Sequence, residues 1–489
     1  MWSKEDLKEL EKRNISISEI EKQIEIFKRG FKHTTLVRPA TINDGIIKFN
    51  SFEENKYLKK YEESIKNKSV IKFVPASGAA TRMFKEFYEF INSDSSNIEE
   101  FKNLKNFFAN IEKLPFYEML LNIVDIKQEI EKNNYKKILQ KILSPEGLNY
   151  GNLPKALIPV HKYQNEIRTP FEEHLVEGVL YSKINNKVKI HFTVQEEHLH
   201  DFKKIEEEKL KKYEEKYNVL FEIEYSTQMP CTDTIAVDIN NQPLRENNKL
   251  VFRPGGHGAL LKNLNNINED IIFIKNIDNV CPDKLKQDTE KYKKILCGFL
   301  LEIIEKIFEF QKKFDNGIIE MEGIISFFKN YFHLEVRPKT NEEVKELLFR
   351  PVRVCGMVKN VGQPGGGPFW ALDSKKNISL QIVEMSQINT NDPKQKEILV
   401  NSTHFNPVDI VCCIKNYKGE KYDLSKFVDY ETYFITEKTK DGIPLKALEL
   451  PGLWNGSMAF WNTIFIDVPI TTFNPIKTIF DILKENHLQ

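Results

Sequence analysis

The feature that most constrains the fold is an alternation of short apolar runs with long amphipathic stretches, which begins near Ala156. Apolar runs of this length are typical of strands buried on both faces. Strands that alternate with helices predict a mainly parallel, doubly wound sheet. The predicted strands are 70–74, 156–160, 188–194, 219–225, 271–277, 352–358, 378–383, 410–414 and 464–468, and the long helices are 196–217 and 283–313.

Two further regions have helical spacing. Residues 4–30 have the pattern of one or two amphipathic helices, and residues 84–145 are helical in period and rich in Lys, Glu, Asn and Phe. We therefore predict an N-terminal helical segment, 1–67, and one α/β domain, 68–489, with a helical insertion at 84–150. The glycine-rich run 362–368 predicts a loop, which is either a mobile lid or an inert hairpin connection.

The charge and cysteine content exclude several classes of protein. Lys and Arg number 71, as do Asp and Glu, so no net field attracts the chain to nucleic acid or to an anionic membrane. The charged N-terminus lacks the apolar run of a signal peptide, and no apolar stretch approaches the roughly 20 residues of a spanning helix. The six cysteines have no zinc-site spacing, which is typical of reduced thiols. We therefore expect a cytoplasmic protein without nucleic-acid or membrane partners, and no pattern indicates an oligomeric state.

Two motifs carry polar groups that suit a ligand site. The loop 252–258 contains Gly255, Gly256, His257 and Gly258, and glycines allow a backbone to approach a ligand closely. A tight turn explains the same glycines equally well. Asp278 follows the apolar run 271–277, and ligands in open α/β sheets bind beyond the carboxyl ends of strands. Asp278 is therefore placed either to hold a metal ion or to cap a turn.

Three cationic residues are candidates for binding phosphate. The small residues at 75–80 join a strand to a helix that we expect to begin near Thr81, so free N–H groups could face a phosphate, and Arg82 could add a bidentate contact. The loop lacks the Gly-Lys-Ser/Thr ending of a P-loop, and an ordinary strand-to-helix turn is the alternative. Lys155 and Lys477 each lie close to a proline, and each is a surface lysine in the simpler interpretation.

In their order along the chain, these motifs resemble those of the UTP–glucose-1-phosphate uridylyltransferase and UDP-N-acetylhexosamine pyrophosphorylase superfamily. The resemblance covers about residues 68–485. The chain resembles an uncharacterised bacterial branch of this superfamily that is catalogued only as a domain of unknown function. The family's Gly-Gly-x-Gly-Thr-Arg-Met loop is matched at 77–83, its Pro-Lys at 154–155, its Pro-Gly-His-Gly uracil loop at 255–258 and its Phe-x-x-Asn-x-Asp-Asn strand end at 273–279. Its Leu-Gln-Leu-x-Glu segment is matched at 380–388, its Phe-Asn at 405–406 and its Phe-x-Pro-Val-Lys-Thr segment at 473–478.

The resemblance implies a glycosyltransferase-A-like, Rossmann-like nucleotidyltransferase domain and a reaction that depends on Mg²⁺. A nucleoside triphosphate, with UTP expected first, and a sugar 1-phosphate would give an NDP-sugar and pyrophosphate. The implied nucleotide-binding residues are Ser77, Gly78, Ala79, Thr81, Gln228, Gly256, His257 and Gly258, and the implied sugar-binding residues are Asn279, Glu384 and Asn406. Asp278 would hold the metal, and Arg82, Lys155 and Lys477 would be the catalytic cations.

The chain also departs from the family pattern. Ser77 and Ala80 stand where the family prefers glycine, and a long insertion separates Arg82 from Pro154. We expect no C-terminal β-helix domain of the kind that the family carries. Two other functions therefore remain open. One is a glycosyltransferase that consumes an NDP-sugar and would not need Lys477; the other is a catalytically inactive protein that binds a nucleotide or sugar nucleotide.

Overall fold

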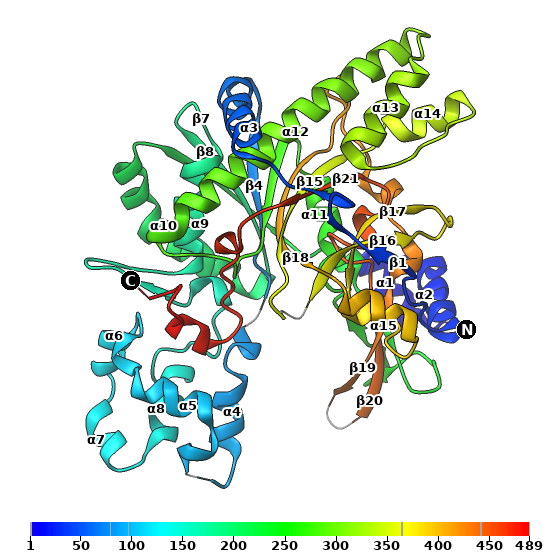
Figure 1. The fold of residues 1–489 in the computed structure, drawn as a ribbon. Coiled ribbons are helices and arrows are strands. Elements are labelled where there is room, and N and C mark those ends of the chain that lie inside the picture. Colours follow the sequence, from blue (N-terminus) through cyan, green and yellow to red (C-terminus); the bar gives the residue numbers. More distant parts are fainter. Residues whose placement is uncertain (1, 79, 96, 363–364, 441–442, 489) are drawn as a thin grey trace. The chain divides into compact units, whose positions relative to one another are not determined.

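The computed structural model describes residues 2–78, 80–95, 97–362, 365–440 and 443–488 (Figure 1). These residues form two compact units, each assembled from three separate stretches of the chain. Unit 1 comprises Met1–Ser69, Gln228–Ile272 and Ile295–Val468. Unit 2 comprises Val70–Thr227, Phe273–Lys294 and Pro469–Gln489.

Unit 1 is built on a sheet with the strand order β2-β3-β21-β15-β18. The strands are β2 (Thr41–Ile42), β3 (Gly45–Ile47), β21 (Asn462–Asp467), β15 (Val352–Lys359) and β18 (His404–Cys413). Neighbouring strands are parallel except for the antiparallel pair β15–β18. Val352 pairs with Asn462 and Met357 pairs with Asp467. The amino-terminal ends of β15 and β21 therefore lie side by side, and so do their carboxyl-terminal ends.

Smaller antiparallel sheets complete unit 1. In one of them, β16 (Gly366–Leu372) lies between β1 (Leu36–Pro39) and β17 (Ile378–Glu384). In another, the order is β13 (Phe252–Arg253), β10 (Thr234–Val237), β20 (Ile443–Glu449) and β19 (Phe434–Lys440). A short ribbon pairs β11 (Arg245–Glu246) with β12 (Lys249–Leu250).

The N-terminal helices of unit 1 are defined by their caps and by one apolar face. The side chains of Ser3 and Ser16 accept hydrogen bonds from the first turns of α1 (Lys4–Arg13) and α2 (Ile17–Arg29). Their buried residues pack with strand residues of β10 and β20 in one apolar cluster. The other helices are α3 (Ser51–Ser64), α11 (Leu261–Asn265), α13 (Met321–Phe332), α14 (Asn341–Leu348) and α15 (Pro393–Val400), and α12 (Lys286–Asp315) begins in unit 2 and ends in unit 1.

Unit 2 is built on strands in the order β14-β4-β8, with β7 and β9 beside β8. These are β14 (Ile271–Lys275), β4 (Val70–Pro75), β8 (Lys187–Val194), β7 (Lys183–Ile184) and β9 (Leu220–Thr227), and the pairs β4–β8 and β8–β9 are parallel. A capping box formed by Thr169 and Glu172 starts α9 (Pro170–Tyr181), and α10 (Leu199–Tyr217) precedes β9. A short ribbon pairs β5 (His161–Lys162) with β6 (Ile167–Arg168).

A buried charge cluster connects α9 to two neighbouring strands of unit 2. Glu177 lies with Oε2 3.1 Å from Nζ of Lys72 on β4 and with Oε1 2.8 Å from Nζ of Lys275 on β14, and none of the three side chains is more than 1% exposed. Burial outweighs the attraction to Glu177 and lowers the pKa of Lys72 to about 7. The cluster therefore fixes the relative positions of β4 and β14, whose carboxyl ends lead to the candidate site residues.

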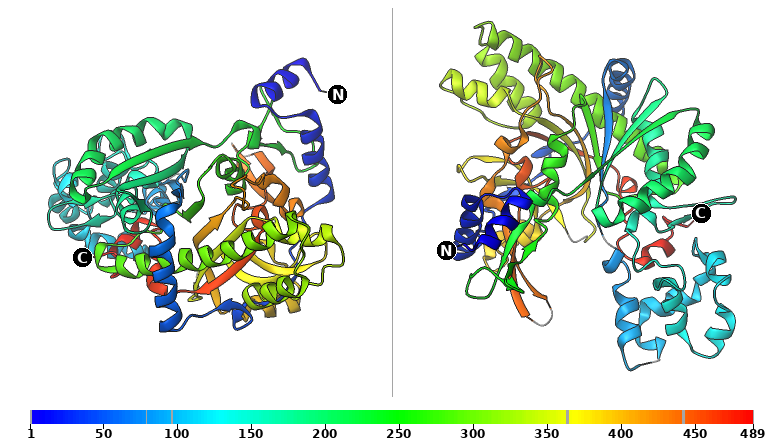
Figure 2. Two further views of the ribbon diagram at one scale, coloured as in Figure 1. Left: turned by 90° about the horizontal axis from the view of Figure 1, so that it is seen from above. Right: turned by 180° about the vertical axis from the view of Figure 1, so that it is seen from behind.

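Five helices between β4 and α9 form a separate helical body within unit 2. They are α4 (Lys85–Asn92), α5 (Lys102–Ala109), α6 (Tyr117–Leu121), α7 (Ile126–Glu131) and α8 (Tyr135–Leu143). Figure 2 shows these cyan helices together with the red C-terminal segment beside them. Ile476, Ile479 and Ile482 of that segment are buried in the same phenylalanine-rich core as Phe87 and Phe107. The C-terminal segment is thus an integral part of this core.

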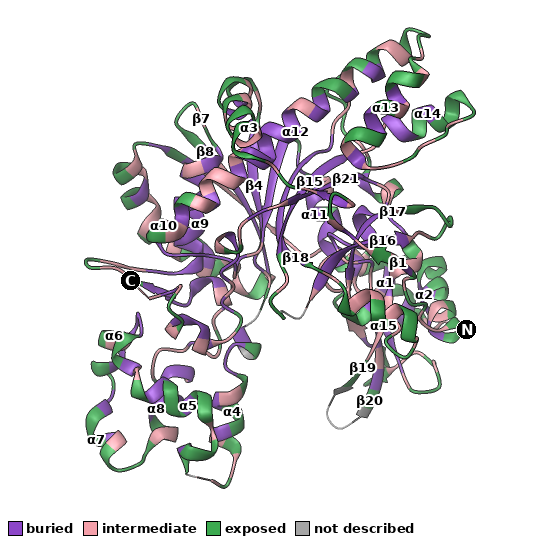
Figure 3. Cartoon of the chain, viewed as in Figure 1, coloured by how far each residue is buried: buried purple, intermediate pink, exposed green. Residues whose placement is uncertain are grey.

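The structure confirms the mainly parallel α/β sheet and corrects two local predictions. Strands β4, β14, β15, β18 and β21 are buried along most of their length (Figure 3). No strand forms at 156–160, where a 3₁₀ turn (Lys155–Leu157) allows Ala156 and Leu157 to be buried without pairing. The predicted loop 362–368 is shorter than expected, because Gly366 already pairs with Glu384 in β16. Residues 363 and 364 lie outside the described residues.

Candidate functional site

Four segments that are distant in sequence meet in unit 2, and we call their meeting point the Asp278 cluster: Gly78, Lys155, Asp278 and residues 474–479. Nζ of Lys155 lies 3.1 Å from Oδ2 of Asp278. The backbone N–H of Lys155 donates to the carbonyl of Gly78 at 3.5 Å, and the N–H of Ile476 donates to the carbonyl of Asp278 at 2.8 Å. One carboxylate and one lysine therefore lie together beside the loop that follows β4.

The C-terminal segment is fixed to the cluster by several hydrogen bonds. Asn279 forms an antiparallel bridge with Pro475, and its Oδ1 accepts a hydrogen bond from the N–H of Asn474 at 2.9 Å. The N–H of Ile479 donates to the carbonyl of Met83 at 3.1 Å. Lys477, between these anchors, has an exposed side chain. The anchors hold Lys477 at a defined position in the same unit as Asp278.

Asp278 is less deeply placed than its sequence context predicts. β14 ends at Lys275, so Asp278 lies in the following turn and is not the last residue of the strand. Its side chain is 24% exposed and that of Lys155 is 12% exposed. The pair is therefore accessible to a ligand. Asn279 is buried, and its Nδ2 has no hydrogen-bond acceptor among the described residues.

The loop after β4 differs from the predicted strand-to-helix turn. Ala80–Arg82 form a 3₁₀ turn, and the α-helix begins only at Lys85, so the predicted helix start near Thr81 is wrong. Arg82 is exposed and Ser77 is half-buried, whereas Ala79 lies outside the described residues. A Cβ on Gly78 would meet no atom within 4 Å. Packing within the protein therefore does not require glycine at 78, which leaves space there for a ligand.

The glycine loop of unit 1 has the opposite property. A Cβ on Gly255 would lie 2.5 Å from the Thr232 carbonyl oxygen, and a Cβ on Gly258 would lie 2.1 Å from the Pro451 carbonyl oxygen. Gly256 has φ +73°, which L-residues rarely adopt. The close approach of Thr232 and of residues 449–452 thus requires these glycines for packing, and this favours the tight-turn interpretation of the loop.

The imidazole ring of His257 nevertheless has a defined protonation state and tautomer. Its Nδ1 accepts a hydrogen bond from the N–H of Leu453 at 3.1 Å, and its ring stacks on Trp454 with centroids 4.5 Å apart. Desolvation lowers the pKa of His257 to about 4. The neutral ring therefore carries its proton on Nε2, which lies 3.8 Å from Oε1 of Glu384. About a third of each side chain is exposed, so both can contact a ligand.

Gln228 and Asn406, also in unit 1, are engaged elsewhere. Gln228 hydrogen-bonds the Asp233 carboxylate, which pairs with Arg13 at 2.6 Å. Asn406 is 4% exposed, and its Oδ1 accepts a hydrogen bond from the N–H of Val408. Val408 has φ +58°, a strained conformation for a β-branched residue, within an irregular stretch of β18. Neither residue shares a hydrogen bond with His257 or Glu384 in the part of the chain that the structure describes.

The structure adds Trp454 and Arg353 to the residues around His257. Arg353 is fully buried; it donates from Nη1 to the Trp454 carbonyl at 2.6 Å and from Nε to Oγ1 of Thr463 at 2.8 Å. No carboxylate of the described residues lies within ion-pair distance of it, and burial lowers its pKa. The sequence around Trp454, Pro-Gly-Leu-Trp-Asn-Gly, contains two glycines and is the signal that could have identified this second loop.

Asp278 is the candidate ligand for Mg²⁺. Within the described ranges, no group of three or more His, Cys, Asp or Glu side chains is placed to hold a metal ion. Mg²⁺ usually keeps several waters and is bound through one or two carboxylates together with substrate phosphates. A single, partly exposed carboxylate such as Asp278 fits a Mg²⁺ ion that binds together with a nucleotide. Among the described helices, none combines the length and apolar character that crossing a bilayer requires.

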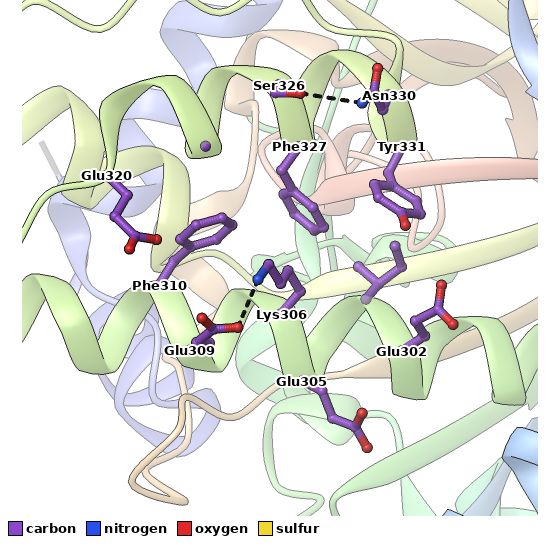
Figure 4. Close-up of a pocket in the computed structure, with 12 residues that line it drawn as sticks. Glu302, Glu305, Lys306, Glu309, Phe310, Glu320, Ser326, Phe327, Asn330 and Tyr331 are labelled. Carbon is purple, nitrogen blue, oxygen red and sulfur yellow. Dashed lines mark hydrogen bonds and ion pairs between the residues drawn. The ribbon is translucent and has the colours of Figure 1, made fainter.

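A hollow of about 540 Å³ lies between α12 and α13 but is not a candidate site (Figure 4). Its floor is aromatic, with the rings of Phe310 and Phe327 5.6 Å apart. The glutamates on its rim are already paired, because Lys313 lies 2.6 Å from Glu309 and 3.0 Å from Glu320. None of the site residues predicted from the sequence lines this hollow.

The model of a family described as "Domain of unknown function (DUF4301)" matches residues 3–488. No curated protein matches the sequence. Similar solved structures include a UDP-glucose pyrophosphorylase from Leishmania major in complex with UDP-glucose (12% identity, 98% of this chain and 77% of that chain, TM-score 0.48). A UDP-N-acetylglucosamine pyrophosphorylase from Trypanosoma brucei (13%, 94% and 71%, TM-score 0.49) and a UDP-glucose phosphorylase from the same organism (12%, 99% and 80%, TM-score 0.47) are also similar. A functional assignment therefore has to come from the residues of this chain.

Proposed function

The chain belongs to the DUF4301 family, and we propose from its own residues that it is a Mg²⁺-dependent nucleotidyltransferase. It would join a nucleoside triphosphate, with UTP as the first candidate, to a sugar 1-phosphate and release pyrophosphate. The observation that supports this most directly is the Asp278 cluster. The motifs at 77–83, 154–155, 273–279 and 473–478 resemble, in order, the phosphate and metal motifs of the uridylyltransferase superfamily, and they contact one another within unit 2.

The reaction needs positioned charge more than covalent chemistry. The sugar phosphate oxygen attacks the α-phosphorus of the nucleotide in line, and negative charge accumulates on the transferred and departing phosphates. Lys155 would bind the α-phosphate, and Arg82 would stabilise the departing pyrophosphate. Lys477 would hold the phosphate of the sugar 1-phosphate, as a preorganised cation. Mg²⁺ held by Asp278 would supply further charge stabilisation between the phosphates.

The Lys155–Asp278 pair suits this function. A nucleotide with its metal ion would bring a cation for Asp278 and a phosphate anion for Lys155. Asp278 could therefore contact the metal ion in place of Lys155, and Lys155 could contact the phosphate in place of Asp278. An ion pair this close to solvent contributes little to stability, about 0 to 1 kcal/mol. Exchanging it for ligand contacts therefore costs the fold little.

In unit 1, His257 and Glu384 are the candidates for contacts with a base or a sugar. The Nε2–H of His257 is a donor and Glu384 is an acceptor, and their separation of 3.8 Å places them where one ligand group could meet both. In unit 2, Gly78 and Asn279 remain candidates. Gln228 and Asn406 are weaker candidates, because their polar atoms already bind protein groups.

The test is pyrophosphate release from a panel of nucleoside triphosphates and sugar 1-phosphates with Mg²⁺. We expect release with at least one pair, loss of release in Asp278→Asn, and unchanged release in Asp201→Asn, a control on α10 of the same unit. UDP release from a UDP-sugar without pyrophosphate would instead indicate a glycosyltransferase. Nucleotide binding without turnover of any pair would indicate an inactive binding protein.

A further inference from the structure

Unit 1 contains a second hollow, of about 810 Å³, near the amino-terminal ends of β15 and β21. It lies among α14, the chain that follows α13, the turn between β16 and β17, and residues 459–462. We call it the Arg350 pocket, after the residues used here: Arg350, Trp370, Lys375, Lys376, Phe460 and Trp461. Its volume is within the range of about 300 to 1,000 Å³ that is typical of small-molecule sites.

Arg350 is a cation without a carboxylate partner. Its Nε donates to the Glu346 carbonyl oxygen at 2.7 Å, and no carboxylate of the described residues lies within 4 Å of its guanidinium. Desolvation lowers the pKa of Arg350, although Glu346 and Asp373 oppose that effect. A largely desolvated charge without a paired partner is unfavourable for the fold. Such a residue is a candidate for a ligand contact.

Trp461 supplies an independent observation on the same wall. It is 4% exposed, it lines the pocket, and its Nε1–H has no acceptor within the described ranges. Trp370, which also lines the pocket, differs in this respect, because its Nε1 donates to the Asp44 carbonyl at 3.2 Å. A buried donor without a partner destabilises the fold. Trp461 thus has a buried donor without an acceptor at the wall of the pocket, and the guanidinium of Arg350 has no carboxylate partner among the described residues.

The turn between β16 and β17 places two lysines at the mouth of the pocket. Lys375 and Lys376 are exposed, and Nζ of Lys375 lies 4.9 Å from the ring centroid of Phe460. No ion pair involves either lysine among the described residues.

Most of the acidic residues that line the pocket already contact donors of the protein. Asp373 accepts hydrogen bonds from Asn377, Glu343 accepts from the N–H of Lys339, and Glu335 lies 3.9 Å from Arg337. Among the described residues, the Glu346 side chain has no such contact. The unengaged groups of the pocket are therefore predominantly donors and cations.

We propose that the Arg350 pocket binds a small metabolite that carries a phosphate group. A phosphate offers several acceptor oxygens, which match a guanidinium in bidentate geometry and an additional N–H donor. The aromatic walls and the volume leave space for the organic part, a nucleoside or a sugar. The site shares no residue with the Asp278 cluster, so the proposal stands independently of the proposed activity.

Isothermal titration calorimetry on the full chain, with UMP, glucose 1-phosphate and inorganic phosphate as separate ligands, tests the proposal. We expect at least one of them to bind at a site that Arg350→Met weakens at least about 10-fold and Trp461→Phe weakens about 3- to 10-fold. The same site should persist in Lys477→Ala, which alters only the candidate active site. Lys396→Met, at an exposed position on α15, is the control for removing one positive charge. Binding of inorganic phosphate alone would indicate a phosphate site without an organic subsite and would overturn the metabolite proposal.

Two further results would overturn the proposal. One is binding of every ligand to Arg350→Met and Trp461→Phe with the affinity of the unmodified chain. The other is no binding of any of the three ligands at about 10 mM. Because Trp461→Phe preserves an aromatic side chain at that position, it keeps the test decisive even where Arg350→Met fails to fold. Pyrophosphate release measured on the same variants separates a failure of this site from a failure of the proposed activity.

Discussion

Nζ of Lys155 lies 3.1 Å from Oδ2 of Asp278, although 123 residues separate the two in sequence. Lys155 stands in a 3₁₀ turn after the helical body, and Asp278 stands in a turn after β14. The contact therefore places the turn after β14 beside the segment that follows α8, the last helix of the helical body. Both side chains are partly exposed, so their opposite charges remain available to a ligand.

Replacing either member of this pair should affect activity far more than stability. We expect Asp278→Asn and Lys155→Met each to lower pyrophosphate release at least about 100-fold, because each removes a charge that would act on phosphate or metal. The free energy of unfolding should change by less than about 1 kcal/mol, since the pair is close to solvent. Denaturant unfolding and pyrophosphate assays on the two single variants and the double variant check this. Activity that merely follows the folded fraction would show that the pair is structural.

Lys477→Ala should lower kcat by about 10²- to 10³-fold with folding intact, which is the scale of losing one preorganised charge. Lys484→Ala is the matched control, because Lys484 is an exposed lysine of the same C-terminal segment that pairs with Asp481. Steady-state kinetics with a sugar 1-phosphate as the varied substrate measures the effect. Equal activity of the two variants would reduce Lys477 to a surface lysine.

The two glycine loops should respond differently to alanine. Gly258→Ala places a Cβ 2.1 Å from the Pro451 carbonyl oxygen, so we expect a loss of about 1 to 3 kcal/mol in the free energy of unfolding. Gly78→Ala meets no atom within 4 Å and should leave stability unchanged. If nucleotide approaches the loop after β4, Gly78→Ala should still weaken UTP binding. Thermal unfolding with and without UTP and Mg²⁺ distinguishes these effects.

His257 should make stability depend on pH below neutrality. Its pKa is about 4 in the folded chain and 6.5 ordinarily, so between these values the unfolded chain takes up a proton that the folded chain does not. The contribution of His257 is therefore complete above about pH 6.5 and decreases as the pH falls towards 4. His257→Phe, which retains a ring to stack on Trp454, should remove this part of the pH dependence of Tm. An unchanged pH profile in the variant would show that His257 has its ordinary pKa.

Lys72 should produce the corresponding effect above neutrality. Its pKa is about 7 in the folded chain and 10.5 ordinarily, so between these values the unfolded chain holds a proton that the folded chain has released. The unmodified chain should therefore gain stability relative to Lys72→Met as pH rises through this window, by at most about 1.4 kcal/mol per pH unit. Lys162→Met, at an exposed position of unit 2, controls for the substitution. A difference between the chain and Lys72→Met that is constant with pH would contradict the lowered pKa.

Local patterns predicted the long strands β4, β8, β9, β14, β15, β17, β18 and β21 and most of the long helices, because apolar periodicity reflects burial along one segment. They did not predict β10, β16, β19 or β20, and the strand predicted at 156–160 does not form. They did not predict α9, whose residues from Phe171 to Val179 are buried on every side and so lack an amphipathic stripe. The packing of Gly258 was equally hidden, since the atom that requires glycine belongs to Pro451. The buried Arg353 gave no signal either, because its partners are carbonyl and hydroxyl groups of distant residues.

For the candidate site, the order of the motifs predicted which segments could act together but not their geometry. The contact of residues 474–479 with Asp278 and Met83 depends on the whole of unit 2. The positions of Gln228 and Asn406 depend on partners, Asp233 and Val408, that no motif indicates. Residue type and spacing therefore identified candidates, and tertiary contacts separated exposed candidates from engaged ones.

The route of the chain through unit 2 has a consequence for biosynthesis. The helical core is closed by Ile476, Ile479 and Ile482, and the same segment hydrogen-bonds Asp278, Asn279 and Met83. While a ribosome is still translating the residues before this segment, the nascent chain has β4, α9 and the helical body but lacks the segment that completes their core. The Asp278 cluster can thus form only after residues 474–479 have been translated, and a protease that cuts between Val468 and Asn474 before folding would separate the closing segment from the residues before it.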